Sequence, residues 1–161
     1  WSKNMKTNKI TRPGSKKSTV KTKKLKGSYY KIISKSKRTV QYVKPVKKNI
    51  ISVTIPSSIK LNGKRYKVTG IAANAFKNCK KLKKVTIGIN VNSIGKRAFY
   101  GCSKLQTIKV KTSKLTGSRV GKQAFKGLNK KAVIKVPKKQ LKAYKRLFRA
   151  KGVGKKVTIK K

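Results

Sequence analysis

The chain has 161 residues, of which 49 are Lys or Arg and none is Asp, Glu or His, so its formal net charge at pH 7 is +49. General acid–base catalysis, catalytic triads, glycoside hydrolysis and the common metal sites depend on the missing residue types. We therefore expect a protein that is not an enzyme and that binds no metal ion or cofactor, with a lysine nucleophile as the one catalytic alternative left open.

The kind of basic residue and the lack of apolar runs limit the partners further. Lys outnumbers Arg by 42 to 7, which favours general attraction to polyanions over the forked, base-reading contacts that Arg makes. No stretch approaches the roughly 20 apolar residues of a membrane-spanning helix. Trp1 is followed at once by polar and basic residues, unlike a signal peptide. Because the chain does not start with Met, we expect an excised fragment or a processed chain.

The first part of the chain, residues 1–27, is rich in Lys, Thr and Ser and poor in apolar residues. This composition is typical of a flexible basic linker or tail. The alternative is one or two strands around Ser18 to Leu25 that pair with the following domain. Residues 28–161 are predicted to form that domain.

Two β-hairpins are predicted over residues 28–67, where they form an N-terminal cap. In the first, β-branched and aromatic residues lie on both sides of a polar turn at residues 34–37. In the second, Asn62-Gly63 lies between alternating apolar residues, which is the strongest short-range signal for a hairpin. Residues 51–56 alternate strictly and end at Pro, which predicts a further strand between the two hairpins.

Residues 68–137 contain an internal repeat. Residues 68–88 and 91–111 align at an offset of 23, a degenerate third copy follows at an offset of 26, and Val53 and Ile55 belong to an earlier half-copy. A period of roughly 20–29 residues with a recurring Leu-x-x-Ile-x-Ile core is typical of a leucine-rich-repeat solenoid, in which each unit buries its apolar side against the next. The residues predicted to form the core are Phe76, Cys79, Leu82, Phe99, Cys102, Leu105 and Phe125.

These repeats resemble the BspA-like leucine-rich repeats of bacterial cell-surface and secreted proteins. The pattern of that family runs roughly Ile-x-x-x-Ala-Phe-x-x-Cys-x-x-Leu-x-x-Ile-x-Ile-Pro, and residues 75–87 and 98–110 match it. The resemblance covers about residues 50–137 and implies an extracellular role in adhesion or anchoring. This chain departs from the family in charge, because typical copies carry Glu and Asp on the solvent face.

Residues 136–148 resemble the segment that closes such solenoids, and their apolar residues recur at the spacing of an amphipathic helix. Gly152 would end the helix, and residues 157–159 suggest a last short strand. We therefore expect residues 138–161 to form a C-terminal cap of helix and strand. The predicted fold is α/β: a short right-handed leucine-rich-repeat solenoid of stacked strands joined by turns or short helices, with N-terminal hairpins and a C-terminal capping helix.

Cys79 and Cys102 occupy the same position in adjacent repeats, where the third copy has Leu128. Cys is among the most commonly buried small apolar residues, so we expect both to be core residues. A disulfide between stacked coils is the alternative, and its geometry is demanding. Tyr100 is predicted to point outward, where its ring would be available to stack on a base or a sugar.

The outward positions of the predicted strands suggest a binding face. If Val85 and Ile87 point inward, Lys84 points outward, and the same alternation exposes Lys109 and Lys135. Strands stack roughly 4.7–4.9 Å apart, so these ammonium groups lie within a Debye length of one another. The alternative is a solvated basic shell without a particular site. The full set of candidate anion-binding residues is Lys80, Lys81, Lys83, Lys84, Arg97, Lys104, Lys109, Lys111, Lys135, Lys138, Lys142, Lys145, Arg146 and Arg149.

We expect a monomeric, non-catalytic module for surface interaction, adhesion or wall anchoring, secreted or held at a bacterial cell surface. Its expected partners are anionic polymers (teichoic acid, sulfated or sialylated glycans) or acidic proteins. Charge alone predicts binding of nucleic acid in low salt, although no nucleic-acid motif accompanies that charge. The alternatives are a nonspecific nucleic-acid-binding protein, a helix that acts on anionic membranes, and a domain supercharged by design or by natural drift.

Overall fold

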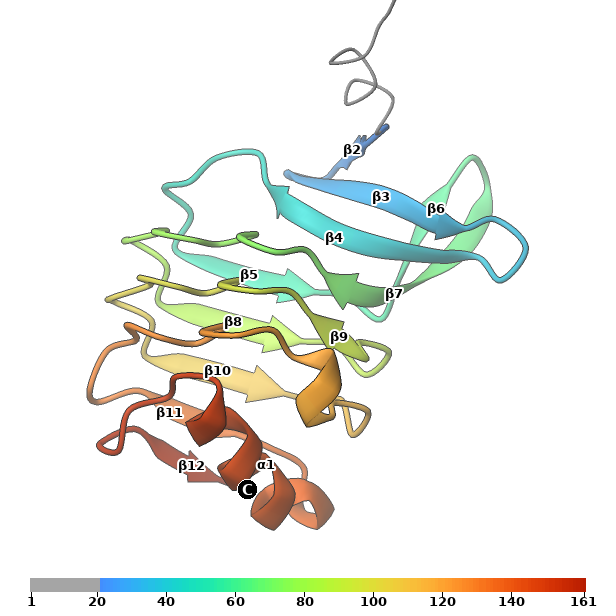
Figure 1. Ribbon diagram of the computed structural model, residues 1–161. Helices are drawn as coiled ribbons and strands as arrows, with labels where there is room; N and C mark the ends of the chain where they lie inside the picture. The colour runs from blue at the N-terminus through green and yellow to red at the C-terminus, as the bar shows by residue number, and fades with distance from the viewer. Residues whose placement is uncertain (1–20) are drawn as a thin grey trace, which may run out of the picture.

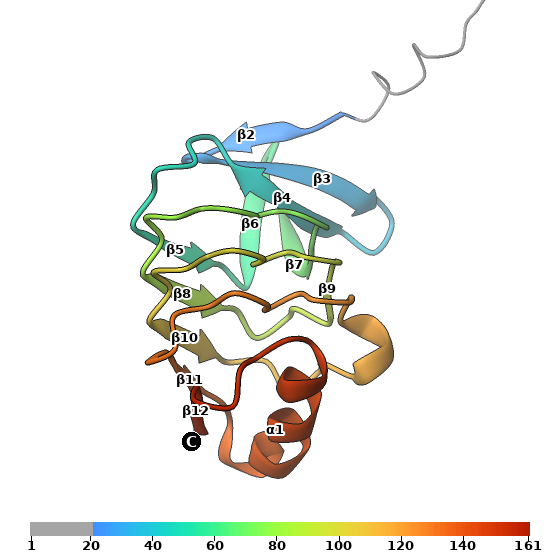
Figure 2. The same cartoon turned by 60° about the vertical axis from the view of Figure 1, so that its left-hand side comes forward.

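Two β-sheets organise the protein, and stacked coils of the chain connect them (Figures 1 and 2). The computed structural model describes residues 21–161. The strands are β2 (Lys23–Leu25), β3 (Ser28–Ser34), β4 (Thr39–Pro45), β5 (Ser52–Ile55), β6 (Ser58–Leu61), β7 (Lys64–Ile71), β8 (Lys84–Ile87), β9 (Ser93–Ile94), β10 (Thr107–Val110), β11 (Val133–Lys135) and β12 (Thr158–Lys160). The helical segments are the 3₁₀ turns η3 (Gly117–Arg119) and η4 (Lys138–Gln140) and the α-helix α1 (Leu141–Ala150).

The first sheet is parallel and takes one strand from each coil, in the order β12-β11-β10-β8-β5. The strands pair in register, so that Val53, Val85, Ile108, Ile134 and Ile159 form one column across the sheet. The last four of these side chains are buried. This one-strand-per-coil stacking confirms the predicted leucine-rich-repeat arrangement, which buries the apolar side of each unit against its neighbours.

The second sheet contains the two predicted hairpins. β3 pairs antiparallel with β4, and β6 pairs antiparallel with β7. The β6–β7 turn is the predicted Asn62-Gly63 turn, and both residues have positive φ, at 51° and 77°, as the preferred hairpin turn requires. β7 also pairs in parallel with β4 and with β9 of the next coil, so this strand joins the hairpins to the solenoid.

Two predicted boundaries differ from the structure. Lys23–Leu25, placed in the basic tail, form β2 and pair with β3; the alternative of a recruited strand describes these residues, and residues 1–20 lie outside the described part of the chain. Ser52–Ile55, placed in the N-terminal cap, form the first strand of the parallel sheet because they pair in register with β8. The half-copy at Val53 and Ile55 is therefore a full member of the repeat sheet.

A ladder of aromatic rings runs through the core. Tyr42, Phe76, Phe99 and Phe125 stack in turn, with centroid separations of 5.2, 5.0 and 5.3 Å, and Phe148 meets the last ring edge-on at 4.9 Å. All the predicted core residues are buried, which confirms that part of the prediction. The sequence predicted only Phe76, Phe99 and Phe125 of this series. Tyr42 of the second sheet and Phe148 of α1 extend it, and Tyr30 and Tyr144 meet these two rings edge-on at 5.4 and 5.6 Å.

The turns that carry the Ala-Phe pairs are bonded to one another through the backbone. The Phe76 amide donates to the Ala98 carbonyl at 2.7 Å, and the Phe99 amide donates to the Ala124 carbonyl at 2.8 Å. The repeat therefore places one turn directly over the next. Because adjacent turns lie this close, some positions between the coils, such as Gly95, have no room for a side chain.

Gly95→Ala is expected to lower the free energy of unfolding by about 3 kcal/mol, measured by urea denaturation at fixed salt. A Cβ at Gly95 would lie 2.5 Å from the Cα of Ala73, and backbone cannot move aside as a side chain can. Gly117→Ala is the matched control, because a Cβ there would meet nothing within 4 Å. Equal losses in the two variants would show that coil spacing is not the constraint.

The C-terminal segment forms the predicted helix and final strand, α1 and β12. Tyr144, Leu147 and Phe148 are the buried residues of α1. The Tyr144 hydroxyl donates to the Thr112 carbonyl at 2.8 Å and accepts from the Leu115 amide at 3.2 Å. These contacts attach the helix to the preceding coil, at the C-terminal end of the stack (Figure 2).

Candidate anion-binding face

A row of three lysines crosses the outer face of the parallel sheet. Lys109 pairs with Lys135, and Lys135 pairs with Lys160, in adjacent strands of β10, β11 and β12. All three side chains are exposed, because they alternate with the inward Ile and Val residues of the same strands. Adjacent strands lie roughly 4.7–4.9 Å apart, so the register holds three positive charges in a line.

Hydroxyl groups continue and flank this lysine row. In the same row, Thr86 pairs with Lys109, and Thr54 pairs with Thr86. A second outward row contains Lys84 with hydroxyl neighbours and runs Ser52, Lys84, Thr107, Val133 and Thr158. The face therefore combines point charges with groups that both donate and accept hydrogen bonds.

The structure places the predicted face differently in one respect. Lys109 and Lys135 are direct neighbours, but Lys84 lies in the second row, opposite Thr107 rather than Lys109. Lys160 takes the third place in the lysine row and was not predicted. The signal was available in the sequence, because an Ile-Lys pair recurs at residues 108–109, 134–135 and 159–160.

The other candidate residues are not gathered into one place. Those in turns and at strand ends are exposed: Lys80, Lys81, Lys83, Lys104 and Lys111. Those of η4 and α1 are also exposed: Lys138, Lys142, Lys145, Arg146 and Arg149. Arg149 has a structural role, since its guanidinium donates to the carbonyls of Gly154 and Val157. These candidate residues in the turns, η4 and α1 add to the positive field of the protein but do not extend the lysine row.

Arg97 and Tyr100 form a local cluster at a coil turn. Arg97 has a positive φ of 55°, and its guanidinium Nε donates to Oε1 of Gln123 in the next coil at 2.9 Å. Its guanidinium also lies 5.6 Å from the centre of the Tyr100 ring, and Nζ of Lys77 lies 5.9 Å from it. Tyr100 is half-buried and is engaged by cations of its own chain, unlike the outward ring that the sequence suggested.

Cys79 and Cys102 are buried and are not joined by a disulfide. The Cys102 thiol donates to the Phe76 carbonyl at 3.0 Å. Burial raises the pKa of Cys102 to about 12 and also raises the pKa of Cys79. Both thiols are therefore neutral at pH 7, whereas the thiolate is the reactive form of cysteine. These residues fill the core, as expected.

Within residues 21–161, no helix is long and apolar enough to cross a membrane.

The comparison with protein families supports the repeat assignment. Residues 46–161 match the BspA type leucine rich repeat region, in six copies. The match begins before β5 and runs to the end of β12, so it includes the coil that the sequence reading had placed in the N-terminal cap. A search of curated proteins finds no match.

Solved structures of bacterial leucine-rich-repeat proteins share the fold. A leucine-rich repeat protein from Bacteroides capillosus is 22% identical, with a TM-score of 0.58 over 86% of this chain and 97% of that one. A leucine rich cell surface protein from Faecalibacterium prausnitzii is 20% identical, with a TM-score of 0.56 over 73% of this chain. This second match covers only 37% of the longer protein.

Proposed function

Because the chain belongs to the BspA-type leucine-rich-repeat family, we propose that it is a non-catalytic interaction module that binds anionic polymers at a bacterial surface. The proposed ligands are teichoic acid and sulfated or sialylated glycans. We propose that they bind on the outer face of the parallel sheet, along the lysine row Lys109, Lys135 and Lys160.

The register of these three lysines is the observation that carries the proposal. A chain without Asp or Glu has no side chain that could neutralise the row from within. Each exposed lysine contributes a modest attraction of roughly 0.2–1 kcal/mol, as exposed ion pairs do. Several such contacts along one polymer add together, and the neighbouring Thr and Ser hydroxyls can accept or donate hydrogen bonds to a sugar.

The triple variant Lys109→Gln, Lys135→Gln, Lys160→Gln is expected to bind heparin or teichoic acid about tenfold more weakly near 150 mM salt. The matched control replaces three exposed lysines away from this face in the same way: Lys35 and Lys37 of the β3–β4 turn and Lys64 of β7. It removes the same charge and is expected to weaken binding only about twofold. Affinities are measured for both variants across a salt series.

The ligand panel separates this function from a general attraction to polyanions. It contains teichoic acid, heparin, hyaluronan, duplex DNA and single-stranded RNA. If both triple variants lose affinity equally for every ligand, the protein is an electrostatic tether without a binding face. If only DNA or RNA keeps its affinity at about 200 mM salt, nucleic-acid binding replaces the proposal.

A further inference from the structure

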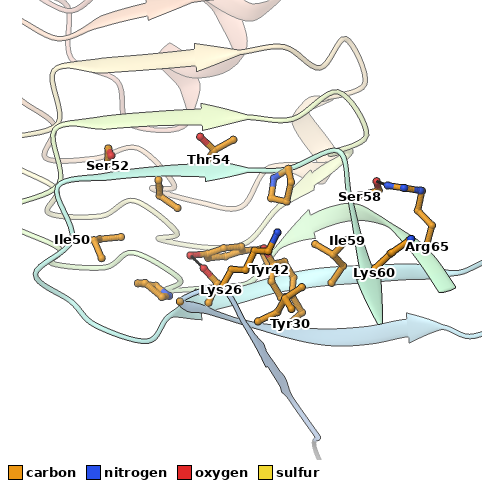
Figure 3. A pocket seen from close by; sticks show the side chains of 16 residues that line it. Lys26, Tyr30, Tyr42, Ile50, Ser52, Thr54, Ser58, Ile59, Lys60 and Arg65 are labelled. Atoms are coloured by element: carbon orange, nitrogen blue, oxygen red, sulfur yellow. Dashed lines mark hydrogen bonds between the residues drawn. The ribbon is translucent and has the colours of Figure 1, made fainter. Parts of the chain in front are cut away.

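A cavity of about 680 Å³ lies between the two sheets at the N-terminal end of the solenoid (Figure 3). One side of the cavity is formed by β5, the first strand of the parallel sheet. The other sides are formed by residues of β2, β3, β4, β6 and β7 and by the turn between β2 and β3. The rings of Tyr30 and Tyr42 and the side chain of Ile59 lie between these elements. Its volume is within the range of sites that hold small molecules.

β5 is an edge strand beside this cavity. Among residues 21–161 it pairs only with β8 and stands last in the sheet order. The Ile51 carbonyl accepts from the Lys83 amide at 2.7 Å, so it points toward β8. Because backbone groups of alternate residues point to opposite sides of a strand, the N–H and C=O groups of Ser52 and Thr54 point to the unpaired edge. An unpaired edge is a template for another strand.

The cavity is lined by apolar and hydroxyl-bearing side chains, and its rim is positive. Lys26, Lys60 and Arg65 are exposed and line it together with apolar residues of both sheets. Arg65 is held in place by a hydrogen bond from its guanidinium to Ser58 Oγ at 2.9 Å. Nothing in the whole sequence can supply a negatively charged side chain to this rim, because the chain has no Asp or Glu.

We propose that an extended segment of another protein, with apolar and acidic residues in alternation, binds here as an added strand beside β5. Its backbone pairs with Ser52 and Thr54, its apolar side chains enter the cavity, and its carboxylates meet the rim cations. Strand addition of this kind takes affinity from the main-chain bonds and specificity from pockets for alternate side chains. The site contains none of the three lysines of the lysine row. It uses the backbone edge of Ser52 and Thr54, whereas the polymer face uses their side chains, and it goes beyond the proposed binding of anionic polymers.

Charge complementarity selects this occupant over a second copy of the chain or one of its own segments. Residues 1–20 contain Lys and Arg but no acid, and a second copy carries another +49. Either one would bring cations to a rim that is already positive, at a cost that increases as salt is lowered. An acidic strand instead places unlike charges opposite one another.

The test uses the full chain and an eight-residue peptide, blocked at both ends, that alternates Val and Glu. Its control peptide has the same composition with four Val followed by four Glu, so the two peptides carry equal charge. The alternating peptide is expected to bind at least about tenfold more tightly. It should also slow hydrogen exchange of the Ser52 and Thr54 amides. Binding by electrostatic attraction alone, without strand pairing, would leave that exchange unchanged.

Thr54→Pro removes the amide that the added strand needs, yet leaves the β5–β8 bonds in place, because proline is tolerated where an edge N–H faces solvent. It is expected to weaken the alternating peptide about tenfold, with an unchanged circular dichroism spectrum. Thr54→Val keeps the amide and should bind normally. The Lys109, Lys135 and Lys160 triple variant should also bind the peptide normally, so failure of this site and failure of the polymer face are distinguishable.

Three results would overturn the inference. The first is equal affinity of the two peptides, which would mean attraction by charge alone. The second is undiminished peptide binding by a folded Thr54→Pro variant. The third is slow hydrogen exchange of the Ser52 and Thr54 amides without peptide, which would mean that another part of the chain or a second copy already pairs with β5. Exchange that slows as the protein concentration rises would indicate the second copy.

Discussion

Phe99→Ala is expected to lower the free energy of unfolding by about 3–5 kcal/mol, the range for truncating a buried aromatic residue. Phe99 is fully buried in the middle of the aromatic ladder, with stacked rings at 5.0 and 5.3 Å on its two sides. Its removal leaves a cavity and breaks both stacking contacts at once. Urea denaturation followed by circular dichroism measures the loss.

Ile89→Ala is the control for this variant. Ile89 is a large apolar residue of the same solenoid, but 54% of its surface is exposed. Its truncation is expected to change the unfolding free energy by less than about 0.5 kcal/mol. A loss below about 1.5 kcal/mol for Phe99→Ala would mean that neighbouring coils close over the gap, so the ladder would not be a rigid support.

Raising NaCl from about 20 mM to 500 mM is expected to stabilise the fold by about 3 kcal/mol, or on the order of 10 °C in Tm. With 49 cationic and no acidic side chains, the folded protein has repulsion between neighbouring charges and no side-chain ion pairs to lose. Salt shortens the range of that repulsion, which is greatest in the compact state. Thermal unfolding in a salt series measures the effect.

The pH dependence provides the control for this salt effect. The chain lacks Asp, Glu and His, the side chains that titrate between about pH 3 and 8. At a fixed ionic strength, Tm is therefore expected to be nearly constant from about pH 4 to 7.5, unlike that of proteins that unfold when paired carboxylates take up protons. A Tm that is unaffected by salt would show that the distances between charges are already too large for repulsion to matter.

The repeat spacing allowed most of the architecture to be predicted. An offset of 23 residues placed Phe76 over Phe99 and Cys79 over Cys102 in adjacent coils, and the structure confirms that all four are buried. Such a period encodes contacts between neighbours directly, because equivalent residues of stacked units meet. The Asn62-Gly63 turn was predictable for a different reason, since few turns accept two consecutive residues with positive φ.

The remaining features depend on pairings that no local pattern encodes. The parallel pairing of β4 with β7 joins segments on either side of β5 and β6, and hydrophobic alternation does not specify a partner strand. Tyr42 reaches the aromatic ladder through that pairing, in which it lies opposite Ile71 of β7. The cavity beside β5 has the same origin, since it lies where the hairpins leave the edge of the repeat sheet uncovered. Lys84 lies in the second row because of the register between β8 and β10. The alternation of inward and outward residues within a strand does not determine that register.

The bonds between successive turns also determine how the molecule opens. Each coil is held chiefly by its two neighbours, as the Phe76 amide is bonded to Ala98 and the Phe99 amide to Ala124. Opening a central coil breaks two interfaces, whereas fraying an end breaks one. Fluctuations therefore begin at the two ends of the stack, and the coil around Phe99 keeps its amides protected longest. In such a stack, the middle of the chain rather than its termini sets the lifetime of the folded state.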